Sequence, residues 1–247
     1  MRQSNLCLHC GTNRVERAAI EAVTTPEATE TWQPISHWEF LGGVQASLET
    51  AGLSVVSESH ALGHGGDRYF GLLQVANGSN PDDYGLVVGV RNSHDKSFPA
   101  SLALGSSVFV CDNLAFSAEV KLARKHTINI RHDLPSVIQR AVGRLGDLRN
   151  EQDGRYNAYK ALGINDATAH DLIVRAIDAR VLPVTKLPEV LHEWREPRHV
   201  EFSPRNVWSL FNAVTEISKG NLELLPRRTQ ALHGLMDAAC GLVAMAV

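Results

Sequence analysis

The apolar positions of residues 36–52 recur every three to four residues, which is the period of an amphipathic helix. Ser36 is a typical N-cap residue, and Glu39 follows three positions later, as in a capping box. Ala51 and Gly52 suit the end of a helix. The sequence therefore predicts a helix here, with one apolar face formed by Trp38, Leu41, Val44 and Leu48.

Beyond residue 52 apolar residues alternate with polar ones or form short apolar runs, which is typical of strands. Stretches rich in glycine and asparagine separate these segments and predict hairpin turns at residues 63–66 and 77–81. We therefore predict three consecutive antiparallel strands, over residues 53–59, 69–76 and 84–91.

A second group of short strands is predicted further along the chain. Residues 108–111 and 115–122 flank Asp112 and Asn113, which tolerate positive φ and suit a tight reversal. One more short strand is predicted over residues 126–130.

From Leu134 to the end the pattern is helical, with apolar stripes over residues 134–148, 167–180, 207–217 and 232–243. Ser203 and Pro204 are predicted to begin the third of these helices, and Gly220 to close it. Strands first and helices afterwards indicate an α+β fold. We expect an antiparallel sheet in the N-terminal half, followed by a mainly helical C-terminal half.

Repeats, low-complexity tracts and long charge runs do not occur in the sequence, so no linker is evident. Residues 1–35 are polar and mixed and are predicted to form an N-terminal arm. Residues 36–150 are predicted to form the sheet with its flanking helices. Residues 151–247 are predicted to form a helical region packed on it as one unit, with the softest boundary in the polar stretch 149–155.

The composition is that of a globular protein, since 44% of the 247 residues are hydrophobic. A net charge of -3 gives no overall attraction for nucleic acid or anionic membranes, so such binding needs a local patch. Four irregularly spaced cysteines and no recognisable secretory leader predict a reducing cytoplasm. The most apolar run, residues 232–247, is shorter than the ~20 apolar residues of a membrane span, so we expect no membrane association.

Cys7, His9 and Cys10 place three metal-ligating side chains within four residues, which is half of a zinc site. The sequence contains no second cysteine pair at this spacing, and an arm with incidental cysteines is the simpler interpretation. His60 and His64, on either side of a glycine-rich turn, are further metal candidates. We expect no cofactor.

His94 and Asp95 lie in the turn after the third predicted strand, and a histidine paired with a carboxylate can act as a general base or metal ligand. The loops that carry His60, His64 and His94 could converge at one end of an antiparallel sheet. Alternatively, Ser93 and Asp95 simply close a polar turn by binding their own backbone.

The same turn offers a guanidinium, an amide, an imidazole and an ammonium group, from Arg91, Asn92, His94 and Lys96. This set suits an anion such as phosphate better than it suits a hydrolytic dyad. We therefore predict an anion-binding loop.

Positive charge is concentrated between residues 121 and 149, a segment that contains seven basic residues and only two acidic ones, Asp133 and Asp147. A strand edge and the polar face of the following helix could line a groove that follows a phosphate backbone. An ordinary solvated helix face explains the charges equally well. The basic residues are Lys121, Arg124, Lys125, Arg131, Arg140, Arg144 and Arg149.

Two motifs carry a resemblance to a known family: RNSHDKS at residues 91–97 and GSSVFVCDNLAF at residues 105–116. With these, and with LFNAVT at residues 210–215, the chain resembles domain-of-unknown-function family 932, carried by phages, prophages and plasmids. The resemblance covers most of the chain from Ser36 onwards and implies a mobile-element protein without assigning catalytic residues. The order of helix, three-stranded meander and long helix is also similar, in topology alone, to Rad52-related single-strand annealing proteins.

The leading hypothesis is a non-enzymatic protein that binds nucleic acid, including single strands, through the Arg91 loop and the basic segment. A homo-oligomer is predicted if the C-terminal apolar helix is a subunit contact, whereas a core helix explains that pattern equally well. Two alternatives are an inhibitor that contacts a host defence protein and a metal-dependent hydrolase. The hydrolase would use His60, His64, His94 and Asp95.

Overall fold

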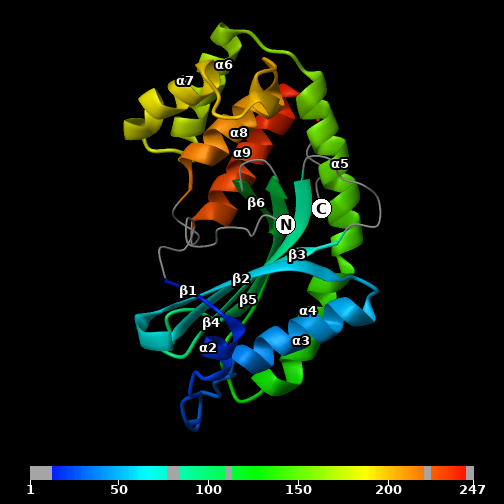
Figure 1. Ribbon diagram of the computed structural model, residues 1–247, viewed down its shortest axis with the longest axis vertical. Coiled ribbons are helices and arrows are strands. Elements are labelled where there is room, and N and C mark those ends of the chain that lie inside the picture. Colours follow the sequence, from blue (N-terminus) through cyan, green and yellow to red (C-terminus); the bar gives the residue numbers. More distant parts are fainter. Residues whose placement is uncertain (1–12, 77–83, 109–112, 220–223, 243–247) are drawn as a thin grey trace.

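The computed structural model describes residues 13–76, 84–108, 113–219 and 224–242, and of residues 108, 113–121 and 226 the backbone alone. Its centre is a six-stranded antiparallel sheet in the order β1-β2-β3-β4-β5-β6 (Figure 1). Each strand pairs with the next one along the chain, so the sheet is a meander. The strands are β1 (Asn13–Val15), β2 (Val55–Gly63), β3 (Arg68–Val75), β4 (Tyr84–Ser93), β5 (Ala100–Val108) and β6 (Asn113–Arg124).

Helices cover the sheet and extend beyond it. α3 and α4 pack side by side near one end of the molecule, while α6 to α9 gather at the other end (Figure 1). α5 is the long helix that connects the two groups (Figure 1). The helices are α2 (Arg17–Glu21), α3 (His37–Thr50), α4 (Ile130–Gly143), α5 (Leu145–Ala161), α6 (Asp166–Asp178), α7 (Leu187–Arg195), α8 (Val207–Ile217) and α9 (Leu225–Ala239).

One hydrophobic core runs through both halves of the chain. Leu73, Val88 and Leu104 are register partners on β3, β4 and β5, and all three are buried in this core. Tyr156 of α5 and Phe211 of α8 belong to the same cluster. The sheet and the helical region therefore bury their apolar faces against each other.

α3 begins where the sequence predicts it. The Ser36 hydroxyl accepts hydrogen bonds from the backbone N–H groups of Trp38, at 3.2 Å, and Glu39, at 3.4 Å. The Glu39 carboxylate pairs with Arg131 of α4, at 2.6 Å, so the first turn of α3 is tied to the neighbouring helix.

The predicted order of strands first and helices afterwards is confirmed, and β2, β3 and β4 match the three predicted strands. The strand predicted over residues 126–130 is wrong. The Ile130 N–H binds the Thr127 carbonyl, at 2.9 Å, and Ile130 begins α4. β5 starts at Ala100, well before the predicted strand, and the predicted reversal at Asp112 lies outside the described residues.

The single apolar stripe predicted over residues 134–148 is divided between two helices. α4 ends at Gly143, Arg144 forms the junction, and α5 begins at Leu145. α5 continues through the polar stretch 149–155 as regular helix. Within this stretch Asn150, Glu151 and Gly154 are exposed, whereas Gln152 is fully buried and Tyr156, which follows it, lies in the core.

The predicted beginning of α8 is wrong. Asn206, not Ser203, is the N-cap, and its side chain accepts a hydrogen bond from the Ser209 N–H, at 2.9 Å. The predicted closing residue, Gly220, lies outside the described residues. No helix within the described ranges has the length and the apolar run that a membrane span requires.

The described part of the N-terminal arm docks on the rest of the protein. β1 pairs with β2, α2 follows directly, and Ile20 and Ile35 are buried in the core. At the opposite end of the chain α9 also packs inward, since Leu232 and Met236 are buried.

Candidate functional site

The turn between β4 and β5 carries the first sequence motif, and its key polar side chains point inward. Asn92 Nδ2 donates a hydrogen bond to the Ile35 carbonyl, at 2.8 Å, and His94 Nε2 donates to the same oxygen, at 3.0 Å. Because a carbonyl only accepts, the proton of His94 is assigned to Nε2. Both side chains are buried, so this part of the turn holds the arm in place.

His37, the first residue of α3, lies next to this contact. Its ring stacks on His94 with the centroids 3.9 Å apart and the planes 7° from parallel. His37 Nε2 donates to the Gly66 carbonyl, at 2.9 Å, which leaves Nδ1 to accept from the Asn92 amide, at 2.9 Å. Burial, together with the adjacent His94, lowers the pKa of His37 to about 4, so its ring is neutral at neutral pH.

His126 contacts the same segment of the arm. Its Nδ1 accepts a hydrogen bond from the Ile35 N–H, at 3.3 Å, and its carbonyl accepts one from the Gln33 N–H, at 3.0 Å. Burial lowers the pKa of His126. Both backbone groups of Ile35 are thus satisfied by side chains that come from distant parts of the chain.

A second chain of polar contacts crosses β3 and β2. The Tyr69 hydroxyl lies 3.0 Å from His60 Nδ1, and Glu58 Oε1 lies 3.5 Å from His60 Nε2. Glu58 binds the Arg17 guanidinium through two hydrogen bonds, one of them 2.6 Å from Nη2 to Oε2, and accepts another from Gln45, at 3.2 Å. The Arg17 hydrogen bond lowers the pKa of Glu58 despite its partial burial.

This Tyr69–His60–Glu58 series has the residue types of a proton relay, but Tyr69 is fully buried. Burial raises the pKa of Tyr69 well above its ordinary value. A substrate atom cannot reach the hydroxyl, so the arrangement serves packing between β2 and β3.

His94 and Asp95 point to different partners. The Asp95 carboxylate binds Arg68, at 2.6 Å, and the Ser97 N–H, at 3.0 Å. Burial disfavours the charge of Asp95, but the Ser97 hydrogen bonds and Arg68 outweigh it and lower the pKa to about 2. The described turn matches the structural alternative, a carboxylate that closes its own turn.

The two histidines proposed as metal ligands differ in environment. His60 is buried beside Tyr69, whereas His64 is exposed in the turn between β2 and β3, with φ at 51°. The described residues contain no group of three side chains that could hold a metal ion. Cys7, His9 and Cys10 lie outside them.

Arg91, near the end of β4, and Lys96, in the turn that follows, lie over aromatic rings. The Arg91 guanidinium is 4.9 Å from the centre of the Phe98 ring, and its Nε donates to the Ser101 hydroxyl, at 2.8 Å. Lys96 Nζ is 4.7 Å from the centre of the Trp32 ring. These contacts hold both cations close to the surface of the turn.

Within the basic segment, three arginines have acidic partners: Arg124 with Asp133, Arg131 with Glu39 and Arg149 with Asp153. Lys125, Arg140 and Arg144 are exposed and form no ion pair with any residue that the structure describes. Lys121 lies on β6, where the backbone alone is described.

Helix geometry places the exposed arginines next to β6. Arg140 and Arg144 follow Asp133 by seven and eleven residues, which is two and three turns, so Arg140 and the cap residue Arg144 lie on the same flank of α4 as Asp133. Asp133 binds Arg124 of β6, which shows that this flank faces β6. We call the surface formed by Arg124, Lys125, Arg140 and Arg144 the α4–β6 surface.

The Arg91 side chain and the α4–β6 surface lie on opposite faces of the sheet. Arg91 is the register partner of Ser101, whereas Arg124 is the partner of Ala100. Successive residues of β5 point to opposite faces, so Arg91 and Arg124 do too. The structure therefore separates Arg91 from the α4–β6 surface, whereas Asn92 and His94 point inward to Ile35.

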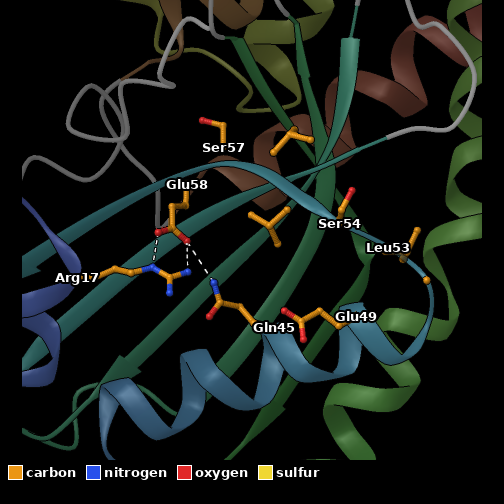
Figure 2. Close-up of a pocket in the computed structure, with 10 residues that line it drawn as sticks. Arg17, Gln45, Glu49, Leu53, Ser54, Ser57 and Glu58 are labelled. Atoms are coloured by element: carbon orange, nitrogen blue, oxygen red, sulfur yellow. Dashed lines mark hydrogen bonds and ion pairs between the residues drawn. The ribbon is translucent and has the colours of Figure 1, made fainter.

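Sequence reasoning missed the residues around Glu58. An open cavity of about 580 Å³ is lined by Arg17, Gln45, Glu49 and Glu58 together with residues 52–57 (Figure 2). Figure 2 shows the Arg17 and Gln45 side chains converging on the Glu58 carboxylate from two different helices. Their spacing in sequence contains no signal for this contact, because the three residues come from separate elements.

A comparison with protein-family models matches residues 27–231 to the family described as Domain of unknown function (DUF932). The chain belongs to the DUF932 family. The DUF932 match begins in the arm before Ile35 and ends within α9, so it includes strands β2 to β6 and helices α3 to α8, but not β1 or α2. The searches of curated proteins and of solved structures found no match. The similarity to Rad52-related annealing proteins gains no support from them and stays a prediction.

Proposed function

We propose that this DUF932 protein binds nucleic acid, single strands included, through the α4–β6 surface. The observation that supports the proposal is the exposure of Lys125, Arg140 and Arg144 beside β6 without an acidic partner among the described residues. Binding would be electrostatic, because lysine and arginine neutralise phosphates and release their counterions. A protein with a net charge of -3 can bind a polyanion in this way when its positive charge is local.

The proposal assigns different roles to the basic residues that the sequence groups together. Lys125, Arg140 and Arg144 contact phosphates directly. Arg124 contributes less, because Asp133 already neutralises it. Arg131 is neutralised by Glu39 and contributes little for the same reason.

The test is a salt titration with a fluorescently labelled oligothymidylate, followed by anisotropy. We expect affinity to fall as salt rises, with a slope of the log–log plot of about -0.7 for each phosphate contact on a single strand. The triple variant Lys125→Gln, Arg140→Gln, Arg144→Gln should reduce that slope by about 2.

A matched control removes three exposed arginines that lie outside the α4–β6 surface: Arg180→Gln, Arg195→Gln and Arg227→Gln. It has the same loss of charge, so it should lower affinity only through the weaker overall field and leave the slope nearly unchanged. Equal effects of the two triple variants, or no binding by the unmodified protein at low salt, would refute the proposal.

A further inference from the structure

Arg124, the last residue of β6, is the member of the α4–β6 surface that has an acidic partner. Its Nη2 binds Oδ2 of Asp133, which lies in the first turn of α4. The Arg124 side chain is 34% exposed and the Asp133 side chain 32%, so solvent reaches both members of the pair. A ligand that lies along this surface therefore meets the pair directly.

The contact with Asp133 does not use all the hydrogen-bond donors of the guanidinium. Arg124 Nε is buried and has no hydrogen-bond partner among the residues that the structure describes. Arginine binds carboxylates and phosphates best through two parallel hydrogen bonds, and a phosphate offers more acceptor oxygens than a carboxylate does. A partly exposed ion pair contributes little free energy. Arg124 can therefore exchange Asp133 for a phosphate.

Asp133 remains in a favourable position when the pair opens. The partial positive charge at the N-terminus of α4 stabilises a carboxylate in the first turn. Because Asp133 is partly exposed, water can also replace Arg124 around it. Opening the pair therefore frees a cation without leaving a buried, unpaired anion behind.

The neighbouring cations determine which ligand can open the pair. Lys125 follows Arg124 directly in the sequence, and Arg140 lies two turns along α4 from Asp133, about 10 Å away. A free phosphate ion competes for Arg124 with a carboxylate that is always beside it. A strand that Lys125 and Arg140 already hold presents a further phosphate to Arg124 at a high effective concentration.

We propose that Asp133 is a built-in competitor for the phosphate site at Arg124, and that a nucleic-acid strand displaces it. This inference rests on the nucleic-acid binding proposed above and adds regulation to the same surface. In the free protein the carboxylate occupies the place of a phosphate and holds the affinity down. The ligand that displaces it is a chain of several phosphates, which makes one more contact once Arg124 is released.

The pair also has a purely structural explanation, because it joins α4 to β6. The two explanations predict different results when Asp133 loses its charge. If the pair only joins the two elements, its removal lowers stability and makes no new phosphate contact. If Asp133 is a competitor, its removal strengthens binding, and the gain depends on the presence of Arg124.

The test compares the full chain with its Asp133→Asn variant. Binding of a long, fluorescently labelled oligothymidylate is followed by anisotropy over a range of salt concentrations. We expect the variant to bind about three- to tenfold more tightly at low salt. The slope of the log–log plot should become steeper by about 0.7, which corresponds to one additional phosphate contact on a single strand.

A matched control opens an acid–arginine pair elsewhere. Asp171→Asn frees Arg175 of α6, which lies at the other end of the molecule from α4 (Figure 1). It makes the same change of net charge, so affinity should rise only slightly and the slope should stay the same.

A second comparison separates displacement from a simple change of charge. In an Arg124→Gln background, Asp133→Asn should no longer steepen the slope, because the released cation is missing. Urea unfolding shows whether each variant is folded, and Asp133→Ser supplies a second uncharged substitution at the same position.

Three results would overturn the inference: no gain in affinity, the same gain in the Arg124→Gln background, or the same gain from Asp171→Asn. The proposed function survives any of them if the unmodified protein binds and the triple variant reduces its slope. Binding by Asp133→Asn but not by the unmodified protein would confirm the competitor and refute the proposed function. Binding by neither would refute both.

Discussion

Mild acid should destabilise this protein through His37. The ring is buried, and its pKa in the folded protein is about 4, against an ordinary value of 6.5. The unfolded chain therefore binds the proton more readily than the folded one across this interval. Stability from His37 is complete above about pH 6.5 and is lost as the pH falls towards about 4.

The size of the effect follows from the difference between the two pKa values. A shift of about 2.5 units corresponds to about 3 kcal/mol once the pH is below both values, and to about 2 kcal/mol near pH 5. This is a large share of a typical unfolding free energy of about 5–15 kcal/mol. His60 and His126 also have lowered pKa values and add to the loss.

The carboxylates of Asp95 and Glu58 contribute little to the change in stability in this range. The pKa values of Asp95 and Glu58 are lowered below their ordinary values near 4, so their stabilisation is lost only at lower pH. Between about pH 7 and about pH 5 the loss of stability reports the buried histidines.

Urea unfolding followed by circular dichroism, at about pH 7.5 and about pH 5, measures the unfolding free energy at each pH. The variant His37→Gln keeps a donor and an acceptor but cannot titrate, so its loss between the two values should be smaller by about 2 kcal/mol. His132→Gln removes an exposed histidine of α4 and should behave as the unmodified protein does. Equal pH dependence in the unmodified protein and in His37→Gln would refute the assignment of a buried neutral ring.

Two further predictions concern folding stability. Gly71→Ala would place a Cβ 2.9 Å from Tyr69 Cζ and closer still to the Tyr69 hydroxyl, so it should destabilise the protein by about 1–3 kcal/mol. Gly42 lies within helix α3, and a Cβ added there meets no atom within 4 Å. Gly42→Ala should therefore stabilise the protein by up to about 1 kcal/mol. Opposite signs in chemical denaturation would confirm the pair, and equal signs would contradict it. Ser36→Ala removes the cap of α3 and should cost about 1 kcal/mol, while Ser47→Ala within the same helix should cost nothing; thermal melts compare the two.

The parts of the fold that sequence reasoning predicted are those set by local rules. Ser36 caps α3 because its hydroxyl reaches N–H groups two and three residues away, and that spacing is visible in the sequence. β2, β3 and β4 follow from alternation and short apolar runs, and the run in β4 reflects burial on both faces, since Val88 lies in the main core and Val87 in a second cluster. The predicted start of α8 is wrong because Ser203 and Asn206 are both good N-cap residues, and the choice between them depends on tertiary packing.

The candidate site was less accessible to sequence reasoning, since its contacts join distant residues. His94 and Asp95 are adjacent, yet one binds Ile35 and the other Arg68, and no pattern in the turn indicates this division. His126 was assigned to a strand because its contact with Ile35, 91 positions away, is invisible in the sequence. The residues of the α4–β6 surface were identified, but only the packing of α4 on β6 separates them from Arg91.

The hydrogen bonds of Ile35 also determine where the folding unit begins. Sequence periodicity suggests Ser36, the cap of α3, as the natural first residue of a shortened protein. A fragment that starts there would leave Asn92, His94 and His126 buried without the backbone groups that they bind. Such a fragment should fold poorly, whereas one that begins at residue 27, where the family match starts, retains Ile35 and its partners. The arm, which also supplies β1 and the buried Ile20, is therefore part of the folding unit, and that unit does not begin at its first long helix.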